Sequence, residues 1–562
     1  MSERLLKRFI ISLLFIISII LSISPIALKI VTGITNLLDK SINITLWSYR
    51  FSHYFIFFAF LFFTVLLCIS FNFKIIFKDF KFKPFFKYFF IFTSSFLILF
   101  FTSTTSPFYP YHIWDDSNCF FTVGNNILNG LVPYKDLVEQ KGPLLYFLHA
   151  FASIISRTSF FGVFIIQVIS LSIFSIFILK ILSLFTDKNI IFLIPFINAI
   201  FFTSKNYILG DSAEELCLIF LIYPMYCSIK NIISNQDYSI KELFLIGICA
   251  GCVLWIKYTM CFYFIGWAII PIYIYIKKSN IKGIFFSFLF IVSGIIITTI
   301  PFIIYFSINN ALSDLFQVYF YNNIFLYGNS SSIKDILISF ITNIIKWVLN
   351  NPKLLFLFIL SIYCLLKKHN NIISLSIFFS FVSLSLGIFI GGNVQPYYSF
   401  ILDIFLIFSL LPIHNYLSKK SLSFEIAFTP ILAIIFSFCF AQYSYISKIK
   451  KNDLPHFIIS NYINNYDNPT ILEYGSLANG FYTLCNIKPI TKYFCTLNIP
   501  LQEMFDEQEL IVNQGKVDFV ITWDSELESE KYELILKKDV YLRTNNTCYL
   551  YKNINIKEPI ND

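Results

Sequence analysis

The sequence predicts a mainly α-helical, polytopic membrane protein with a small C-terminal α/β domain. The chain has 562 residues, of which 57% are hydrophobic and only 13% are charged, whereas a soluble domain has about 25% charged residues. Apolar runs near the length of about 20 residues that crosses a bilayer recur from residue 9 to residue 443. Beyond residue 443 the composition becomes polar and mixed, as in a water-soluble domain.

The apolar runs predict about 13 transmembrane helices and three parts of the chain. We expect the helices at 9–29, 51–73, 88–104, 160–185, 190–204, 209–228, 242–256, 258–276, 283–306, 353–366, 372–391, 397–416 and 422–443. Residues 1–87 then form an N-terminal two-helix membrane segment, 88–443 a transmembrane core with an outer loop at 105–159, and 444–562 an extracytoplasmic domain. In that domain, 469–475 and 517–524 favour strands and 500–515 favours a helix.

The basic residues of the short loops indicate the orientation, because such residues gather on the cytoplasmic side of a membrane. The clusters are Arg4, Lys7 and Arg8; Lys74, Lys78, Lys81, Lys83 and Lys87; Lys277, Lys278 and Lys282; Lys367 and Lys368; Lys419 and Lys420. With alternating helices, all five fall on one side. We therefore expect a multi-pass protein of the inner or plasma membrane, with a cytoplasmic N-terminus and an extracytoplasmic tail. The net charge of +9 reflects this topology, and no nucleic-acid partner is expected.

The outer loop contains the most unusual stretch, DDSNCFFTVGNNILNGLVPYKDLVEQKGPLLYF. Asp115 and Asp116 begin an expected helix, and residues 144–155 form an apolar segment too short to cross the membrane, which suits an interfacial helix. The adjacent acids suit a helix N-terminus. They also suit a proton acceptor, because like charge and partial burial raise the pKa of one carboxyl. Both readings stay open.

Further charges are expected on the same face of the membrane. Glu214 and Glu215 stand at the outer end of the sixth run, either as helix-start charges or facing a cavity or a partner. Lys141 precedes Gly142-Pro143, which suits an anion site at a helix start or ordinary snorkelling. Lys257 is the only charge between Glu242 and Lys277, and a phosphate partner and snorkelling are both open for it.

Other motifs limit the chemistry. The sequence has no Walker loop, no GxGxxG and no nucleophile elbow, so ATP hydrolysis and nicotinamide chemistry are not expected. The histidines show no metal-ligand spacing. Cys485 and Cys495 would be able to pair in an extracytoplasmic tail, but sequence does not decide the pairing.

The outer loop resembles that of bacterial GT-C glycosyltransferases, in the branch of protein O-mannosyltransferases and lipid A aminoarabinose transferases. The family pattern is two acids, a helix, G-x-x-P-Y-x-D and then K-G/P-P. Here it stands as Asp115-Asp116, Gly130 to Asp136 and Lys141-Gly142-Pro143. SAEELCLIF and AGCVLWIKYT, with Lys257, are weaker matches. The resemblance covers about residues 85–410.

The resemblance implies an inverting transfer of a sugar from a polyprenyl-phosphate donor on the outer face of the lipid bilayer. Asp115 would be the general base, and Lys141 and Lys257 would bind the donor phosphate. Asp116, Glu214 and Glu215 would shape the acceptor site or bind a cation. The site-lining residues would be Tyr134, Asp136, Asn322, Tyr397 and Tyr398. No cofactor is certain; a divalent cation held by oxygen ligands stays open. Asn118 stands where aminoarabinose transferases often have arginine, so that sugar is not assumed.

Three other classes of protein fit the sequence less well. A lipid-linked glycan flippase or transporter predicts charges deep within the helices and repeat symmetry, whereas these acids lie in outer loops and no repeat is evident. A polymerase or ligase of another fold predicts a late outer loop rich in Arg and His, which is absent from the sequence. A structural or sensory role is favoured least. The sugar and the acceptor, whether lipid, glycan or protein, stay open.

Overall fold

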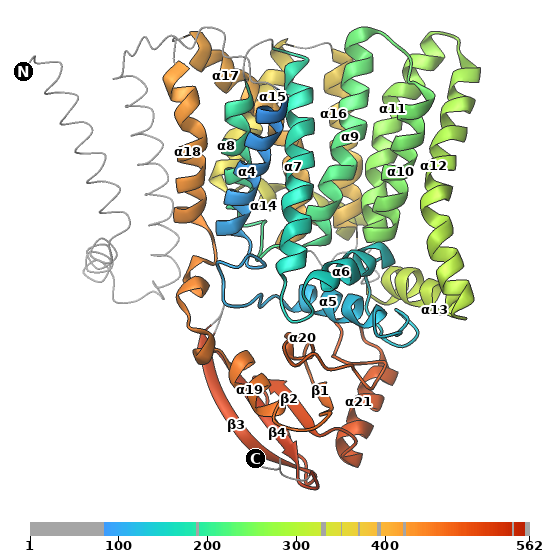
Figure 1. Cartoon of the computed structure of the whole chain (residues 1–562). Helices are drawn as coiled ribbons and strands as arrows, with labels where there is room; N and C mark the ends of the chain where they lie inside the picture. The colour runs from blue at the N-terminus through green and yellow to red at the C-terminus, as the bar shows by residue number, and fades with distance from the viewer. Residues whose placement is uncertain are drawn as a thin grey trace, which may run out of the picture.

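A computed structural model describes residues 84–186, 190–327, 333–349, 351–368, 371–390, 395–419, 423–541 and 545–556. It consists of a layer of upright helices with a small sheet domain below one end (Figure 1). The upright helices are α4 (Pro84–Thr102), α7 (Phe161–Ser183), α8 (Ile194–Phe202), α9 (Ala213–Ser234), α10 (Ile240–Lys257), α11 (Phe262–Lys277), α12 (Ile281–Ile308), α15 (Pro352–Lys368), α16 (Asn371–Phe389), the 3-10 helix η4 (Pro396–Ser409) with α17 (Leu410–Lys419), and α18 (Ser423–Phe440).

The helical membrane fold expected from the sequence is confirmed. Seven helices of the described chain are long and apolar enough to cross a membrane, or up to eight if one bent pair counts as a single span. The expected helices at 9–29 and 51–73 lie outside the described residues. Every later expected helix coincides with one or two observed ones to within a few residues. The total of 13 stays a prediction.

The apolar stretch from α10 to α11 folds back on itself. As one straight helix its 38 residues would be about 57 Å long. However, Asp237 before α10 and Lys278 after α11 form an ion pair at 2.9 Å. The chain therefore reverses at the short 3-10 helix η2 (Tyr258–Cys261), directly after Lys257. This reversal places Lys257 at the end of the bundle that faces the sheet domain.

Two short helices lie across that end of the bundle. α5 (Asp115–Ile127) and α6 (Pro143–Ile155) lie between the upright helices and the sheet domain (Figure 1). Each has 13 residues and is thus about 20 Å long, which is too short to cross a bilayer. They pack closely, since a side chain at Gly124 would overlap the backbone of α6. The apolar segment 144–155 therefore does not span, as expected.

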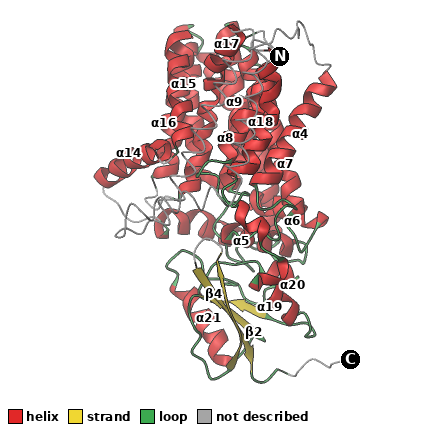
Figure 2. Cartoon of the chain, turned by 90° about the vertical axis from the view of Figure 1, so that its left-hand side faces the viewer, coloured by secondary structure: helices red, strands yellow, loops and turns green. Residues whose placement is uncertain are grey.

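The C-terminal part is a four-stranded mixed sheet with helices beside it (Figure 2). Its strands β1 (Ile471–Glu473), β2 (Phe519–Trp523), β3 (Tyr532–Tyr541) and β4 (Asn545–Asn553) pair in the order β1-β2-β4-β3, with β1 and β2 parallel and the other pairs antiparallel. The helices are α19 (Pro455–Ile463), α20 (Phe481–Cys485) and α21 (Gln502–Gln514). Both expected strands and the expected helix are present.

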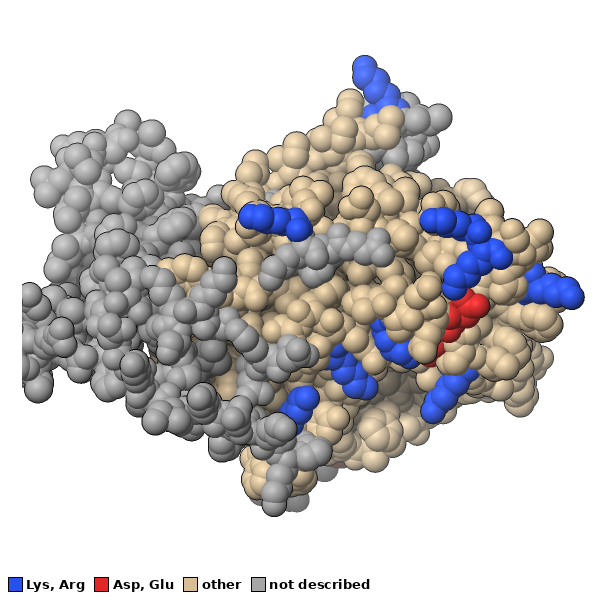
Figure 3. Space-filling model, turned by 90° about the horizontal axis from the view of Figure 1, so that it is seen from above, with Lys and Arg blue, Asp and Glu red and all other residues tan. Residues whose placement is uncertain are grey.

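The opposite end of the bundle carries the basic side chains. Seen from that end, lysines and arginines are scattered over the described surface, and acidic side chains are few (Figure 3). Lys277 and Lys278 end α11 there, and Lys367 lies in the last turn of α15. These described members of the basic clusters thus lie at one end of the fold, away from the sheet domain, whereas the clusters at residues 4–8 and 74–83 lie outside the described residues.

Candidate active site

The acid pair lies at the start of α5, where the outer loop meets the bundle. Asp115 and Asp116 are the first two residues of the helix, and both are half-buried. The hydroxyl of Tyr397, at the start of η4, donates a hydrogen bond of 2.6 Å to Asp116 Oδ2. The ring of Trp114 packs edge-on against Tyr397, with centroids 5.1 Å apart. The second acid of the pair therefore faces the bundle.

The Lys141-Gly142-Pro143 turn is fixed to the end of α10 by backbone contacts. The Gly142 amide donates to the Ile256 carbonyl at 3.0 Å, and a Cβ on Gly142 would overlap the Trp255 carbonyl. Only glycine allows this approach. Because Ile256 precedes Lys257, the glycine brings the Lys141 and Lys257 backbones together. This close approach gives a physical reason for glycine in the K-G-P motif.

Lys141, Lys257 and Asp116 form a charged cluster at this end of the bundle, and Lys141 is the first of its two cations. Its backbone amide donates to the Glu139 carboxylate at 2.9 Å, and the Tyr134 hydroxyl donates to its carbonyl at 2.7 Å. Burial opposes its charge, but the carboxylates of Glu139 and Asp116 raise the pKa of Lys141 above its usual value. Lys141 is therefore a fixed positive charge at the turn before α6, where Asp116 stabilises its charged form.

Lys257 forms the second cation of the cluster. Its ammonium donates to the Glu214 carboxylate, at the start of α9, and lies 3.5 Å from the centroid of the Tyr398 ring. The Glu214 side chain is fully buried. A buried carboxylate is costly unless it is paired, and Lys257 supplies the pair. Lys141 is close enough to act electrostatically on Lys257.

The structure separates the two glutamates that the sequence placed together. Glu215 accepts hydrogen bonds from the Gln167 side chain and the Asp211 amide, both at 2.9 Å. Successive residues of an α-helix point about 100° apart, so only Glu214 faces Lys257. Glu215 belongs to a polar network between α7 and α9, beside the lysine cluster.

The other expected lining residues hold the loops in place. Asp136 accepts the Val132 amide at 2.7 Å. Tyr134 is fully buried with φ 69°. Asn322, in the π-helix η3 (Phe316–Leu326), accepts a 3.0 Å hydrogen bond from Gln317. Tyr398 reaches the Tyr327 hydroxyl at 3.1 Å. Of the lining residues, Tyr397 and Tyr398 contact the charged side chains of Asp116 and Lys257, and Tyr134 contacts the Lys141 carbonyl.

Sequence reasoning missed a buried group centred on His149. Its Nε2 lies 2.8 Å from the Asp211 carboxylate and its Nδ1 lies 2.8 Å from the Leu145 carbonyl. Ser117 of α5 donates to the same Asp211 oxygen. Two acceptors match a doubly protonated ring. Burial opposes that charge, but Asp211 raises the pKa of His149. The histidines show no metal-ligand spacing in the sequence, and pairing of a histidine with a distant acid leaves no such signal.

Asn118 has a local role in the structure. Its amide nitrogen donates to the carbonyls of His112 and Trp114, both at 2.9 Å, and its oxygen accepts from the Tyr111 hydroxyl at 2.9 Å. The side chain therefore fixes the segment before α5. Where aminoarabinose transferases often have an arginine, this chain has a residue whose amide binds its own loop.

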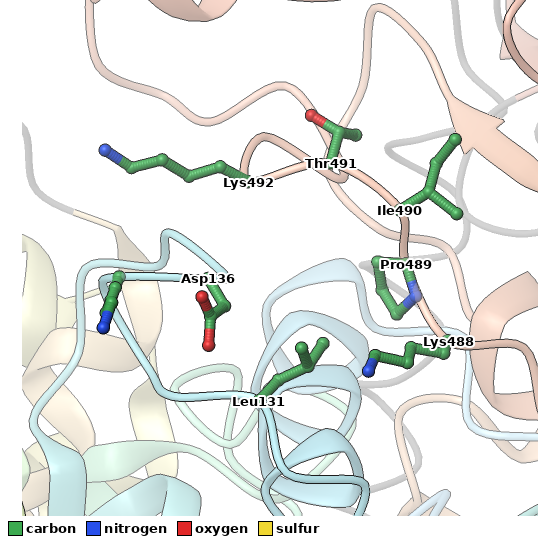
Figure 4. Close-up of a pocket in the computed structure, with 8 residues that line it drawn as sticks. Leu131, Asp136, Lys488, Pro489, Ile490, Thr491 and Lys492 are labelled. Atoms are coloured by element: carbon green, nitrogen blue, oxygen red, sulfur yellow. The ribbon is translucent and has the colours of Figure 1, made fainter. Parts of the chain in front are cut away.

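The sheet domain is joined to the outer loop. The Val138 amide donates to the Lys492 carbonyl at 3.0 Å, and the Tyr111 hydroxyl donates to the Gly480 carbonyl at 3.0 Å. An open cleft of about 480 Å³ lies between loop and domain, lined by Leu131, Lys135, Asp136 and residues 488–492 (Figure 4). Lysines from both sides make its lining basic.

The described side chains form no recognisable metal centre. Within the ranges that the structure covers, no three His, Cys, Asp or Glu residues are arranged to hold a metal ion. Of Asp116, Glu214 and Glu215, for which an acceptor site or a cation site stays a prediction, Glu214 pairs with Lys257 and Glu215 accepts from Gln167.

The architecture is that of a mainly helical, polytopic membrane protein with a small C-terminal sheet domain, as the sequence predicts. Two solved structures of ArnT from Cupriavidus metallidurans, one bound to undecaprenyl phosphate and one in the apo state, each match with a TM-score of 0.55. They are 8% and 7% identical in sequence, and each match covers 82% of this chain and 96% of that chain. The likeness is one of fold. No protein-family model and no curated protein sequence matches the chain.

Proposed function

We propose that the protein is a membrane glycosyltransferase that takes its sugar from a polyprenyl-phosphate donor. The observation that carries the proposal is the cluster of Lys141, Lys257 and Asp116 at one end of the bundle. It lies beside α5 and α6, which are too short to cross a membrane. A lipid-linked donor keeps its isoprenoid tail in the bilayer and its phosphate at headgroup depth. Two cations beside a carboxylate at that depth suit such a donor. The fold shared with ArnT, one structure of which holds undecaprenyl phosphate, supports the same choice.

The proposed step is an inverting displacement at the anomeric carbon of the sugar. Asp115 takes the proton of an acceptor hydroxyl as its oxygen attacks that carbon from the face opposite the phosphate. The bond between the anomeric carbon and the phosphate oxygen breaks, and its electron pair leaves with the polyprenyl phosphate. Lys141 and Lys257 stabilise the negative charge that develops on this leaving group. The products are the glycosylated acceptor and polyprenyl phosphate.

The remaining residues position these groups. Tyr397 orients Asp116, which shapes the acceptor side, and Glu215 fixes the turn before α9 through the Asp211 amide. Glu214 holds Lys257 over the Tyr398 ring until the donor phosphate arrives to share its charge. Tyr134 and Asp136 fix the turn before Lys141, and Asn322 fixes η3 behind it. The acceptor, which is a lipid, a glycan or a protein, reaches the site from the side of the sheet domain.

The proposed orientation follows the basic side chains. The lysine-rich end of the bundle faces the cytoplasm, and the outer loop with the sheet domain faces the extracytoplasmic side of the inner or plasma membrane. A polyprenyl-phosphate sugar and its acceptor meet on that side.

The test follows release of polyprenyl phosphate by purified protein in detergent, from a panel of polyprenyl-phosphate sugars with a mixed envelope extract as acceptor. We expect release that falls about 10²- to 10⁴-fold in Asp115→Asn, the range for loss of a general base. Asp314→Asn, an acid outside the cluster, is the matched control and keeps full activity. If Asp116→Asn shows this loss of release and Asp115→Asn does not, the general base is Asp116 and not Asp115.

The rival class is a flippase for lipid-linked glycans, which needs two compartments. In detergent a flippase releases no polyprenyl phosphate. In proteoliposomes it moves a labelled donor across the bilayer, whether or not Asp115 is present. Transport without release would overturn the transferase proposal.

A further inference from the structure

Cys119 and Cys495 meet at the boundary between the outer loop and the sheet domain. Cys119 lies in the first half of α5, and Cys495 lies in the segment between α20 and α21. Their sulfur atoms are 3.8 Å apart although 376 positions separate them in the chain. Each residue is only 1% exposed. The two thiols therefore face each other in a closed apolar contact.

We infer that Cys119 and Cys495 form a disulfide that fastens the sheet domain to the helix that carries Asp115 and Asp116. The inference rests on the extracytoplasmic orientation proposed above, because disulfides persist in exported compartments and not in the cytoplasm. A bonded pair has its sulfur atoms about 2 Å apart. The two sulfur atoms must approach by less than 2 Å to bond.

The geometry selects this pair over the one that the sequence left open. Cys485 ends α20 and is half-buried, and Cys495 is buried beside α5 and not beside Cys485. Cys548 is buried in β4. Among the described cysteines of the loop and the sheet domain, only Cys119 and Cys495 have an S···S contact within 4 Å. Proximity in sequence thus does not decide the partner of Cys495.

The bond requires a two-electron oxidant, which we take to be the disulfide of an exported thiol oxidoreductase. The thiolate of one cysteine attacks that disulfide to form a mixed disulfide, and the other cysteine displaces the enzyme. Cys119 and Cys495 lose two electrons and two protons, and the oxidoreductase leaves as a dithiol. Burial raises the pKa of the Cys119 thiol in the folded protein. The exchange therefore occurs while the domain is docking, before the pair is closed from solvent.

The bond would connect segments that already share hydrogen bonds. The Val138 and Tyr111 contacts to the sheet domain lie on either side of Cys119 in the chain. A covalent link between them would hold the domain against α5 throughout turnover. It would leave the reacting carboxylates unchanged, so its loss should lower stability more than it lowers the rate of the chemical step.

The test uses the full chain, blocked with N-ethylmaleimide in intact membranes, denatured, and digested without reductant. We expect a cross-linked pair of peptides containing Cys119 and Cys495, lighter by two hydrogens than the two thiol peptides. Cys119→Ser should release Cys495 for alkylation after denaturation. The matched variant Cys485→Ser should leave the cross-link intact. Reductant should lower the melting temperature of the wild type to that of Cys119→Ser, with no effect on that variant.

Two outcomes would overturn the inference, and a label separates it from the proposed function. Full alkylation of both cysteines after denaturation, or a Cys485–Cys495 cross-link, would disprove the bond. The side of the membrane on which the sheet domain lies is tested separately. Asn465→Cys, at an exposed position of the domain, is introduced into the Cys485→Ser variant and treated with a membrane-impermeant maleimide in intact cells. If Asn465→Cys is labelled while Cys119 and Cys495 are found as free thiols, the disulfide is disproved and the extracytoplasmic orientation stands. Lack of labelling places the domain inside, and both the orientation and the disulfide then fall.

Discussion

The ammonium of Lys257 and the carboxylate of Glu214 form a buried ion pair between the end of α10 and the start of α9. Neither residue has a second partner of opposite charge within ion-pair distance in the part of the chain that the structure describes. The pair therefore joins two upright helices at the depth where the site lies. Its energy depends on both charges being present.

The first prediction concerns this pair. Glu214→Gln or Lys257→Met leaves one buried charge uncompensated, which costs about 3–5 kcal/mol. We expect each single variant to melt at a clearly lower temperature in detergent. The double variant should recover most of the loss, because a neutral pair carries no such penalty. Additive losses in the double variant would show that the two residues do not stabilise each other.

The second prediction concerns Gly142. Gly142→Ala introduces a Cβ into the Trp255 carbonyl, so the turn must move and Lys141 must move with it. Forced repacking costs about 1–3 kcal/mol, and a displacement of about 1 Å near a reacting centre can cost about 10²-fold in rate. We expect polyprenyl phosphate release to fall about 100-fold. Leu128→Ala, an exposed position after α5, is the control; unchanged release in Gly142→Ala would contradict the role of the turn.

The third prediction concerns pH and His149. Because Asp211 raises the pKa of His149 in the folded state, the folded form binds its proton more tightly than the unfolded chain does. The stabilisation is fully present below about pH 6.5, the ordinary histidine value, and is lost as the pH rises through the raised pKa. Besides Asp211, the charged and titratable neighbours are Glu139 and His112.

His149→Gln should therefore remove this pH dependence. We expect the difference in melting temperature between wild type and His149→Gln to shrink as the pH rises from about 6.5. His456→Gln is the matched control, because burial lowers the pKa of His456 to about 4 and the ring stays neutral across that range. A constant difference for His149→Gln would show that its ring is neutral throughout.

The fourth prediction concerns Glu473 in β1. Burial raises its pKa to about 7, although the Asn479 and Phe481 amides donate to it. The folded state thus favours the protonated acid, and its contribution to stability is lost as the pH rises from about 4.5 through about 7. Glu473→Gln keeps an acceptor for the amides without the charge. We expect it to stabilise the sheet domain at pH 8, by up to about 3 kcal/mol, and to have little effect at pH 4.5. Hydrogen exchange of β1 amides measures this.

The membrane fold could be predicted because hydropathy is a property of single segments. Each run of apolar residues must satisfy its backbone within one helix, so its position is visible in the sequence. The strands at 471–473 and 519–523 were predictable for a similar reason, through their short apolar runs between turn residues. The position of the loop acids, Lys141 and Lys257 at one end of the bundle could be predicted because successive membrane helices alternate in direction.

What could not be predicted depends on packing between distant segments. Glu214 and Glu215 look equivalent in sequence, and only the face on which α10 packs separates them. His149 gained its role from Asp211, a residue placed by a turn at Gly210 and Asp211 with positive φ at both. Cys495 pairs in space with a residue of the first outer loop. None of these relations has a fixed spacing along the chain.

The apolar face of the outer loop is completed by residues that follow α18, the last described upright helix. Tyr111, Trp114 and Phe121 share a core with Ile446 and Leu454, which follow α18. A ribosome makes the acid-bearing loop early and these partners only after the last described upright helix. Throughout that interval the loop has an uncovered apolar face, which during synthesis is prone to misassembly. Maturation of the site is therefore coupled to synthesis of the segment that follows α18, and a chain truncated after α18 would leave the loop without part of its core.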